Sequence, residues 1–96
     1  MLRAKQKKYL MSMAVHLRPL FQVGKEELSA SFLCMVDRAL EKHELLKIKV
    51  LKTVSKDVKE LAFDMAKNTE SEIVQEIGRV IILYRRSSKK PTLRLP

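Results

Sequence analysis

The chain has 96 residues, of which 46% are hydrophobic and 32% are charged, and its formal net charge is +9. This length suits one domain with one modest core, and the composition is that of a folded soluble protein rather than a disordered one. A single cysteine excludes a framework of internal disulfides, and no apolar run approaches the roughly 20 residues that are needed to span a bilayer.

The first predicted element is an amphipathic helix over residues 3 to 17. Its apolar side chains recur at helical spacing, at Leu2, Tyr9, Leu10, Met13 and Leu17. Pro19 prevents the helix from continuing. The short apolar stretch "PLFQV", which lies before Gly24, then predicts a strand over residues 19 to 23.

The middle of the chain predicts a helix, a strand and a second helix. Ser29 occupies an N-cap position for a helix that ends near His43. In "LLKIKVL", apolar residues alternate with Lys47 and Lys49, which predicts a strand with one apolar and one basic face. Ser55 is the expected cap of the next helix, which runs to about residue 68.

The stretch "EIVQEIGRVIILYRR" predicts strands over residues 72 to 77 and 79 to 85, with a tight turn at Gly78. Strands that are joined through helices predict parallel pairing, whereas the hairpin is antiparallel. We therefore expect a single α+β domain of order α-β-α-β-α-β-β with a four-stranded mixed sheet. The run "VIILY" is apolar on both faces, which favours an interior strand. The domain should span residues 1 to 86, and residues 87 to 96 should form an irregular basic tail.

Positive charge is concentrated at the two ends of the chain. Residues 1 to 25 and residues 77 to 96 each carry six basic side chains and no acid, whereas the stretch between them holds 8 basic and 11 acidic residues. If the ends meet in the fold, they form one positive surface, which is typical of a nucleic-acid binder. The alternatives are lysines that only confer solubility, or a basic targeting peptide at the N-terminus.

Four blocks of the chain resemble, in the same order, the CRM domain (chloroplast RNA splicing and ribosome maturation) in its small free-standing bacterial YhbY-like form. The blocks are "KQKKYL", "HLRPLFQVGK", "RALEKHELLKIKV" and "EIGRVIILYRR". The resemblance implies a fold similar to the C-terminal domain of translation initiation factor three. It also implies an RNA-binding protein without catalytic activity that assembles on precursors of the large ribosomal subunit.

The resemblance draws attention to the turn Gly24-Lys25-Glu26-Glu27. Family members carry a Gly-Lys-x-Gly loop at this place, and here the second glycine is replaced by Glu27. Backbone amides at a helix N-terminus and a lysine suit a phosphate, whereas carboxylates repel it. The turn is therefore either an RNA contact through Gly24 and Lys25 or a plain corner between a strand and a helix.

The candidate RNA-binding residues are basic side chains and this turn: Lys5, Lys7, Lys8, Arg18, Gly24, Lys25, Lys47, Lys49, Arg79, Arg85 and Arg86. Only 5% of the residues are aromatic, so recognition should depend on phosphate charge and RNA shape rather than on base stacking.

We expect a cytoplasmic monomer that binds ribosomal RNA without DNA specificity, membrane contact, metal or cofactor. One cysteine and two histidines are too few ligands for a structural zinc, and no catalytic constellation is present, so the protein should not be an enzyme. The alternative function is a protein-interaction module that docks on an acidic partner or an anionic membrane surface.

Overall fold

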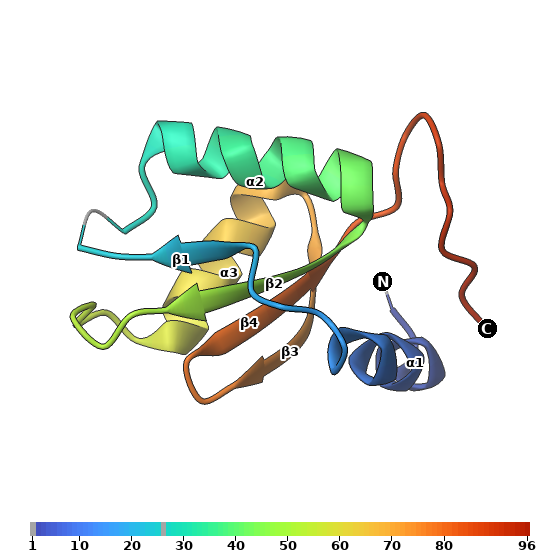
Figure 1. Ribbon diagram of the computed structural model, residues 1–96, viewed down its shortest axis with the longest axis horizontal. Coiled ribbons are helices and arrows are strands. Elements are labelled where there is room, and N and C mark those ends of the chain that lie inside the picture. Colours follow the sequence, from blue (N-terminus) through green and yellow to red (C-terminus); the bar gives the residue numbers. More distant parts are fainter. Residues whose placement is uncertain (1, 26) are drawn as a thin grey trace.

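The computed structural model describes residues 2–25 and 27–96 of the chain. Its elements follow the order α1 (Ala4–Ala14), β1 (Phe21–Val23), α2 (Ala30–His43), β2 (Leu45–Val50), α3 (Val58–Thr69), β3 (Glu72–Ile77) and β4 (Val80–Tyr84). This is the predicted order, and the strands of the described residues form a single mixed, four-stranded sheet. Helices α2 and α3 pack on one face of the sheet and α1 on the other (Figure 1).

The strand order is β1-β2-β4-β3, so β4 has a neighbour on each side, as predicted for the run "VIILY". β1 and β2 pair in parallel, whereas β4 is antiparallel to both β2 and β3. β2 and β3 are also joined through a helix and run in the same direction, but β4 separates them. The predicted parallel pairing of helix-connected strands therefore holds for β1 and β2 only.

β4 is apolar on both faces because its alternate residues enter different cores. Ile81 and Leu83 belong to the cluster under α2 and α3, whereas Ile82 and Tyr84 belong to the cluster under α1. A strand with side chains in two cores must read as a continuous apolar run. The first residues of β2 also divide between the two cores, with Leu45 under α1 and Leu46 under α2 and α3. After Leu45, the face of β2 that is turned toward α1 carries Lys47 and Lys49.

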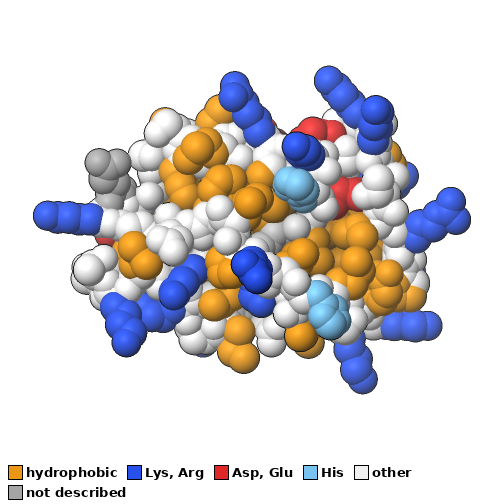
Figure 2. Space-filling model, viewed as in Figure 1, with side chains coloured by type: hydrophobic (Ala, Val, Ile, Leu, Met, Phe, Trp, Pro, Cys, Tyr) orange, Lys and Arg blue, Asp and Glu red, His pale blue; other side chains and the backbone are white. Residues whose placement is uncertain are grey.

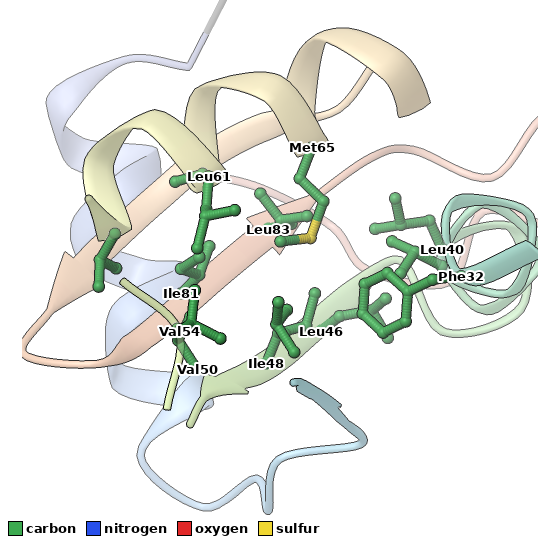
Figure 3. Close-up of a cluster of buried hydrophobic side chains, with 14 residues drawn as sticks. Phe32, Leu40, Leu46, Ile48, Val50, Val54, Leu61, Met65, Ile81 and Leu83 are labelled. Atoms are coloured by element: carbon green, nitrogen blue, oxygen red, sulfur yellow. The ribbon is translucent and has the colours of Figure 1, made fainter. Parts of the chain in front are cut away.

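The larger core lies between the sheet and helices α2 and α3. Figure 3 shows Leu61 and Met65 of α3 directed toward Ile81 and Leu83 of β4. All four side chains are fully buried. Burying side chains of this size stabilises the fold by about 2 kcal/mol each, so this packing fixes α3 on the sheet.

Helix α1 covers the other face through Leu10 and Ala14, both of which are 0% exposed. It ends at Ala14 rather than at residue 17. Two residues of the predicted apolar stripe are more than a third exposed, Tyr9 at 38% and Leu17 at 37%. The buried stripe of α1 is therefore narrower than the sequence spacing predicted.

The helix caps agree with the prediction for α2 and differ for α3. Ser29 Oγ accepts a hydrogen bond from the Phe32 amide at 3.1 Å, as an N-cap should. The predicted cap at Ser55 is wrong, because the α3 cap is Asp57, whose carboxylate accepts from the Lys59 amide at 3.3 Å. Gly78 has φ +58°, which confirms the tight turn that was predicted there.

Strands β1 and β4 are shorter than predicted, whereas β3 has its predicted bounds. β1 begins at Phe21, after the Leu20 amide has donated to the Lys47 carbonyl at 2.8 Å, and Pro19 has no amide with which to extend this pairing. β4 begins at Val80 because Arg79 belongs to the turn. Within residues 2–25 and 27–96, no helix combines the length and apolar character needed to cross a membrane.

Candidate nucleic-acid interface

The N-terminal helix and the C-terminal tail lie side by side, and both chain ends lie at the same end of the molecule (Figure 1). The Gln6 side-chain amide donates a hydrogen bond to the Pro96 carbonyl at 3.3 Å. Leu93 and Leu95 pack against the buried cluster that contains Leu10 of α1. The fold therefore brings together the two cationic, acid-free stretches of the chain.

The tail is held in place by a buried carboxylate at the end of α2. Glu44 is 0% exposed, and its Oε1 accepts hydrogen bonds from the amides of Thr92 at 2.7 Å and Leu93 at 2.8 Å. Its Oε2 accepts from the Ser87 amide at 2.8 Å. Burial alone would raise the pKa of the Glu44 carboxyl, but the hydrogen bonds from Ser87, Leu93 and Thr92 outweigh it and lower the pKa to about 2.

Glu41, one turn earlier on α2, holds the beginning of the tail. Its carboxylate accepts hydrogen bonds from Ser87 Oγ at 2.6 Å and from the amides of Ser88 at 2.9 Å and Lys89 at 3.2 Å. The Ser87 hydroxyl is the main reason that the pKa of Glu41 falls to about 2, and the Ser88 amide adds to it. We call Glu41 and Glu44 the tail clip. The tail clip was not identified from the sequence. An acid near a helix C-terminus is unfavourable for the helix dipole, and this was the available signal that Glu41 and Glu44 have partners elsewhere in the fold.

The junction of α1 and the tail forms a cationic hollow of about 570 Å³. Its lining residues are Gln6, Tyr84, Arg86, Pro91, Leu93, Arg94 and Leu95. Lys5 and Lys8 of α1 are exposed, Lys7 is half-exposed, and Arg86 and Arg94 are exposed on the tail side. We call these five cations the terminal surface. Arg94 was missed as a candidate, and its place in the acid-free segment was the available signal.

Lys47 does not project from the sheet into solvent. Its ammonium donates to the Ala14 carbonyl at 3.2 Å and to the Leu17 carbonyl at 3.3 Å. The last carbonyls of a helix lack intrahelical partners, so Lys47 satisfies the end of α1. The basic face that was predicted for this strand is thus partly covered by α1, whereas Lys49 remains exposed.

Arg79 and Arg85 also point into the protein. Arg79 Nη2 donates to the carbonyls of Leu51 at 2.8 Å and Val54 at 3.0 Å, which fixes the chain after β2. Arg85 pairs with the Asp37 carboxylate, and its Nη1 also donates to the Thr69 carbonyl at 2.8 Å. These contacts tie β4 to α2 and to the end of α3. Arg85 is therefore paired with an acid, whereas Arg79 is held by backbone carbonyls through Nη2.

The Gly-Lys turn lies between β1 and α2, as predicted. Glu26 lies outside the described residues. Lys25 is exposed, and Glu27 has φ +54°, a left-handed conformation that strongly favours glycine. The position where the family carries its second glycine therefore retains a glycine-like backbone.

Gly24 differs from Gly78 because the fold does not require it to be a glycine. It is not among the described residues with positive φ. A Cβ atom at Gly24 would lie 3.7 Å from Leu51 Cδ1, an ordinary van der Waals distance. The hollow beside the turn, about 360 Å³, is lined by Gly24, Lys25, Glu27 and Ser29, among others. Neither strain nor crowding explains the missing side chain.

Arg18 completes the predicted set and is exposed on the segment between α1 and β1. Figure 2 shows lysine and arginine side chains around the outline of the viewed face, with few acidic side chains among them. The charged side chains at the outline of this face are thus mainly cationic.

Within the described part of the chain, no group of three or more His, Cys, Asp and Glu side chains could hold a metal ion.

Comparison with known proteins finds one family and several close relatives. A family model described as the CRS1 / YhbY (CRM) domain matches residues 2–85. The "Probable RNA-binding protein YqeI" of Bacillus subtilis is 40% identical over 96 residues, which cover 100% of each chain. An "RNA-binding protein" of Haemophilus influenzae is 34% identical over 96 residues, covering 99% of this chain and 95% of the relative.

The fold is also similar to a solved structure. The solution structure of the hypothetical protein SAV1595 from Staphylococcus aureus superposes with a TM-score of 0.83. The two sequences are 42% identical, and the match covers 100% of both chains. The helices and strands described above are therefore those of an experimentally determined fold.

Proposed function

The chain belongs to the CRS1 / YhbY (CRM) domain family, and from this membership we propose that it is an RNA-binding protein without enzymatic activity. The observation that carries the proposal is the juxtaposition of two acid-free cationic segments, α1 and the tail, at one end of the molecule. Neutralising RNA phosphates releases condensed counterions, which makes such a surface bind RNA tightly at low salt.

The terminal surface supplies the main phosphate contacts. Lys5 and Lys8 are exposed on the helix, and Arg86 and Arg94 line the hollow beside it, so a phosphate backbone can follow the junction between them. Lysines act as point charges, whereas an arginine fork can hold one phosphate with two hydrogen bonds. The surface thus reads charge and backbone shape rather than base sequence.

The Gly-Lys turn supplies a second contact. Because the fold does not require a glycine at Gly24, the absence of its side chain serves a close approach of the backbone to a phosphate. The exposed ammonium of Lys25 adds attraction, and the carboxylate of Glu27 weakens it. We expect this contact to contribute less affinity than the terminal surface.

The RNA is ribosomal, and the protein acts in the cytoplasm as an assembly factor on the precursor of the large subunit. The chain's resemblance to the free-standing bacterial YhbY-like members supports this assignment, and so does a surface suited to structured RNA. The inward contacts of Lys47, Arg79 and Arg85 leave the terminal surface, Arg18, Lys49 and the Gly-Lys turn as the RNA-facing residues.

Ultraviolet crosslinking in cells, followed by sequencing of the attached RNA, tests the proposal. Fragments should come mainly from large-subunit ribosomal RNA and should include precursor sequences. Crosslinks spread evenly over messenger RNA would contradict the ribosomal assignment. Capture of an acidic protein after nuclease treatment, with no RNA attached, would instead support the protein-interaction alternative.

A further inference from the structure

An apolar groove of about 290 Å³ lies where the end of α1, the end of α2, the start of β2 and the tail meet. Its lining residues are Met13, Leu17, Arg18, Leu20, His43, Leu45, Leu46, Lys47 and Leu93. Figure 2 shows hydrophobic side chains gathered on the right half of the viewed face, with histidine side chains beside them. Leu93 lines both this groove and the cationic hollow at the junction of α1 and the tail.

The groove is held open by hydrogen bonds rather than by loosely placed side chains. The Leu20 amide donates to the Lys47 carbonyl at 2.8 Å, which fixes one wall to β2. The Leu93 amide donates to Glu44 at 2.8 Å, which fixes the opposite wall to α2. A site whose walls are already fixed loses little conformational entropy when a ligand enters.

Two leucines in the walls of the groove have large exposed fractions. Leu20 is 50% exposed and Leu17 is 37% exposed, and both line the groove. A scattered exposed leucine is ordinary, but adjacent exposed leucines that line one concave site are typical of a ligand surface.

The charges at the rim identify the ligand. The exposed cation of the lining is Arg18, and His43 also lines the groove, whereas the ammonium of Lys47 is hydrogen-bonded to the carbonyls of Ala14 and Leu17. An unpaired nucleotide combines a flat apolar base with an anionic phosphate, and it therefore matches an apolar floor with a cationic rim. Histidine rings and arginine guanidinium planes are surfaces on which unstacked RNA bases commonly stack.

We propose that this groove takes one unpaired nucleotide of the bound RNA. The base lies against Leu17 and Leu20, and its phosphate lies at Arg18. The volume is at the lower end of small-ligand pockets, which fits a single base and not a partner helix. This inference rests on the proposed function and adds to it a preference for RNA with a flipped or bulged nucleotide.

The test compares two RNAs that differ by one nucleotide, a short ribosomal RNA duplex and the same duplex with one unpaired nucleotide. The unmodified protein should bind the bulged RNA about tenfold more tightly, because removing roughly 60 Å² of apolar surface from water as the base packs on the leucines supplies an affinity gain of this order. Leu20→Ala should reduce the preference to about twofold or less and leave duplex affinity unchanged. Val15→Ala is the matched control, because Val15 is 72% exposed and does not line the groove.

The outcomes distinguish a failure of the nucleotide site from a failure of the proposed RNA-binding function. Equal binding of the two RNAs by the unmodified protein, or an undiminished preference in Leu20→Ala, would overturn the nucleotide site while leaving RNA binding intact. Absence of binding to either RNA would contradict the proposed function itself, and the nucleotide site with it. A 4-thiouridine at the bulge should crosslink to the segment that contains Arg18 and Leu20, and a crosslink on α3 would overturn the site.

Discussion

The Glu44 carboxylate accepts a hydrogen bond from the Leu93 amide at 2.8 Å, joining the end of α2 to a residue near the C-terminus. Because Glu44 is fully buried, this contact makes the tail part of the packed domain. Leu93 then serves both as a wall of the groove and as part of the cluster under α1. The position of the cationic tail therefore depends on the buried carboxylate of Glu44.

Glu44→Gln should release the tail from the domain. The side-chain amide replaces one acceptor oxygen with a donor that faces the Ser87 or Thr92 amide, so the change should cost roughly 1 to 3 kcal/mol. Hydrogen exchange at the Thr92 and Leu93 amides should become faster, and trypsin should cleave sooner after Lys89. Glu60→Gln, an exposed change on α3, is the control, and unaltered protection of Leu93 in the Glu44 variant would contradict the clip.

The free energy of unfolding should decrease in acid because of the carboxyls of the tail clip, Glu41 and Glu44. In the folded protein the pKa of Glu41 and of Glu44 is about 2, against the ordinary value of 4.5. As the pH falls below about 4.5, the unfolded chain binds protons at these positions before the folded protein does, which favours unfolding. Their contribution to stability is complete above that pH and is lost by about pH 2.

Urea unfolding measured from pH 7 to pH 2 checks this expectation, because it gives the free energy of unfolding at each pH. The Glu41→Gln/Glu44→Gln double variant should show a shallower decline below about pH 4.5 than the unmodified protein. Identical declines in the two proteins would show that other carboxyls control the acid transition.

Glu27→Gly should stabilise the protein and tighten RNA binding. A non-glycine residue at φ +54° is strained, so glycine should raise the free energy of unfolding by about 1 kcal/mol. Removing the carboxylate also removes repulsion of a phosphate near Lys25. Glu70→Gly is the matched control, because Glu70 has φ +52° at the C-cap of α3 and is not part of the Gly-Lys turn.

Both variants should therefore be more stable in thermal unfolding, whereas only Glu27→Gly should gain RNA affinity, by about three- to tenfold at low salt. An equal affinity in both variants would mean that the Gly-Lys turn is a plain corner.

Arg79→Ala should lower stability and leave RNA binding by the folded protein unchanged. The side chain donates to the Leu51 and Val54 carbonyls, and leaving part-buried carbonyls without donors should cost about 1 to 3 kcal/mol. Circular dichroism during heating measures the stability loss, and a filter-binding titration at low temperature measures affinity. A large loss of affinity without a loss of stability would show that Arg79 contacts RNA.

The arrangement of the sheet was predictable where side-chain periodicity reports on burial. The alternation in "LLKIKVL" and the apolar run "VIILY" identified β2 as two-faced and β4 as interior, and both features follow from the pleat of a strand. The position of β4 between β2 and β3 was not predictable, because no local pattern states which strand a hairpin pairs with next.

The functions of individual charged residues were harder to predict. Lys47, Arg79 and Arg85 were grouped with the RNA-binding cations, but their partners include backbone carbonyls, which any sequence supplies at every position. Glu44 escaped notice because its partners, at Ser87, Thr92 and Leu93, lie 43 to 49 residues away along the chain. Contacts of this kind depend on the completed fold and leave no periodic signal.

The salt dependence of RNA binding tests the terminal surface most directly. The triple variant Lys5→Ala/Lys8→Ala/Arg86→Ala should bind a structured fragment of large-subunit ribosomal RNA more weakly. Its plot of log affinity against log salt should be shallower by about two to three, since each lost phosphate contact removes nearly one from the slope. The control triple removes the same charge from the opposite face of the sheet: Lys42→Ala/Lys59→Ala/Lys67→Ala. The account predicts an unchanged slope for the control, and equal losses in the two triples would contradict a terminal RNA-binding surface.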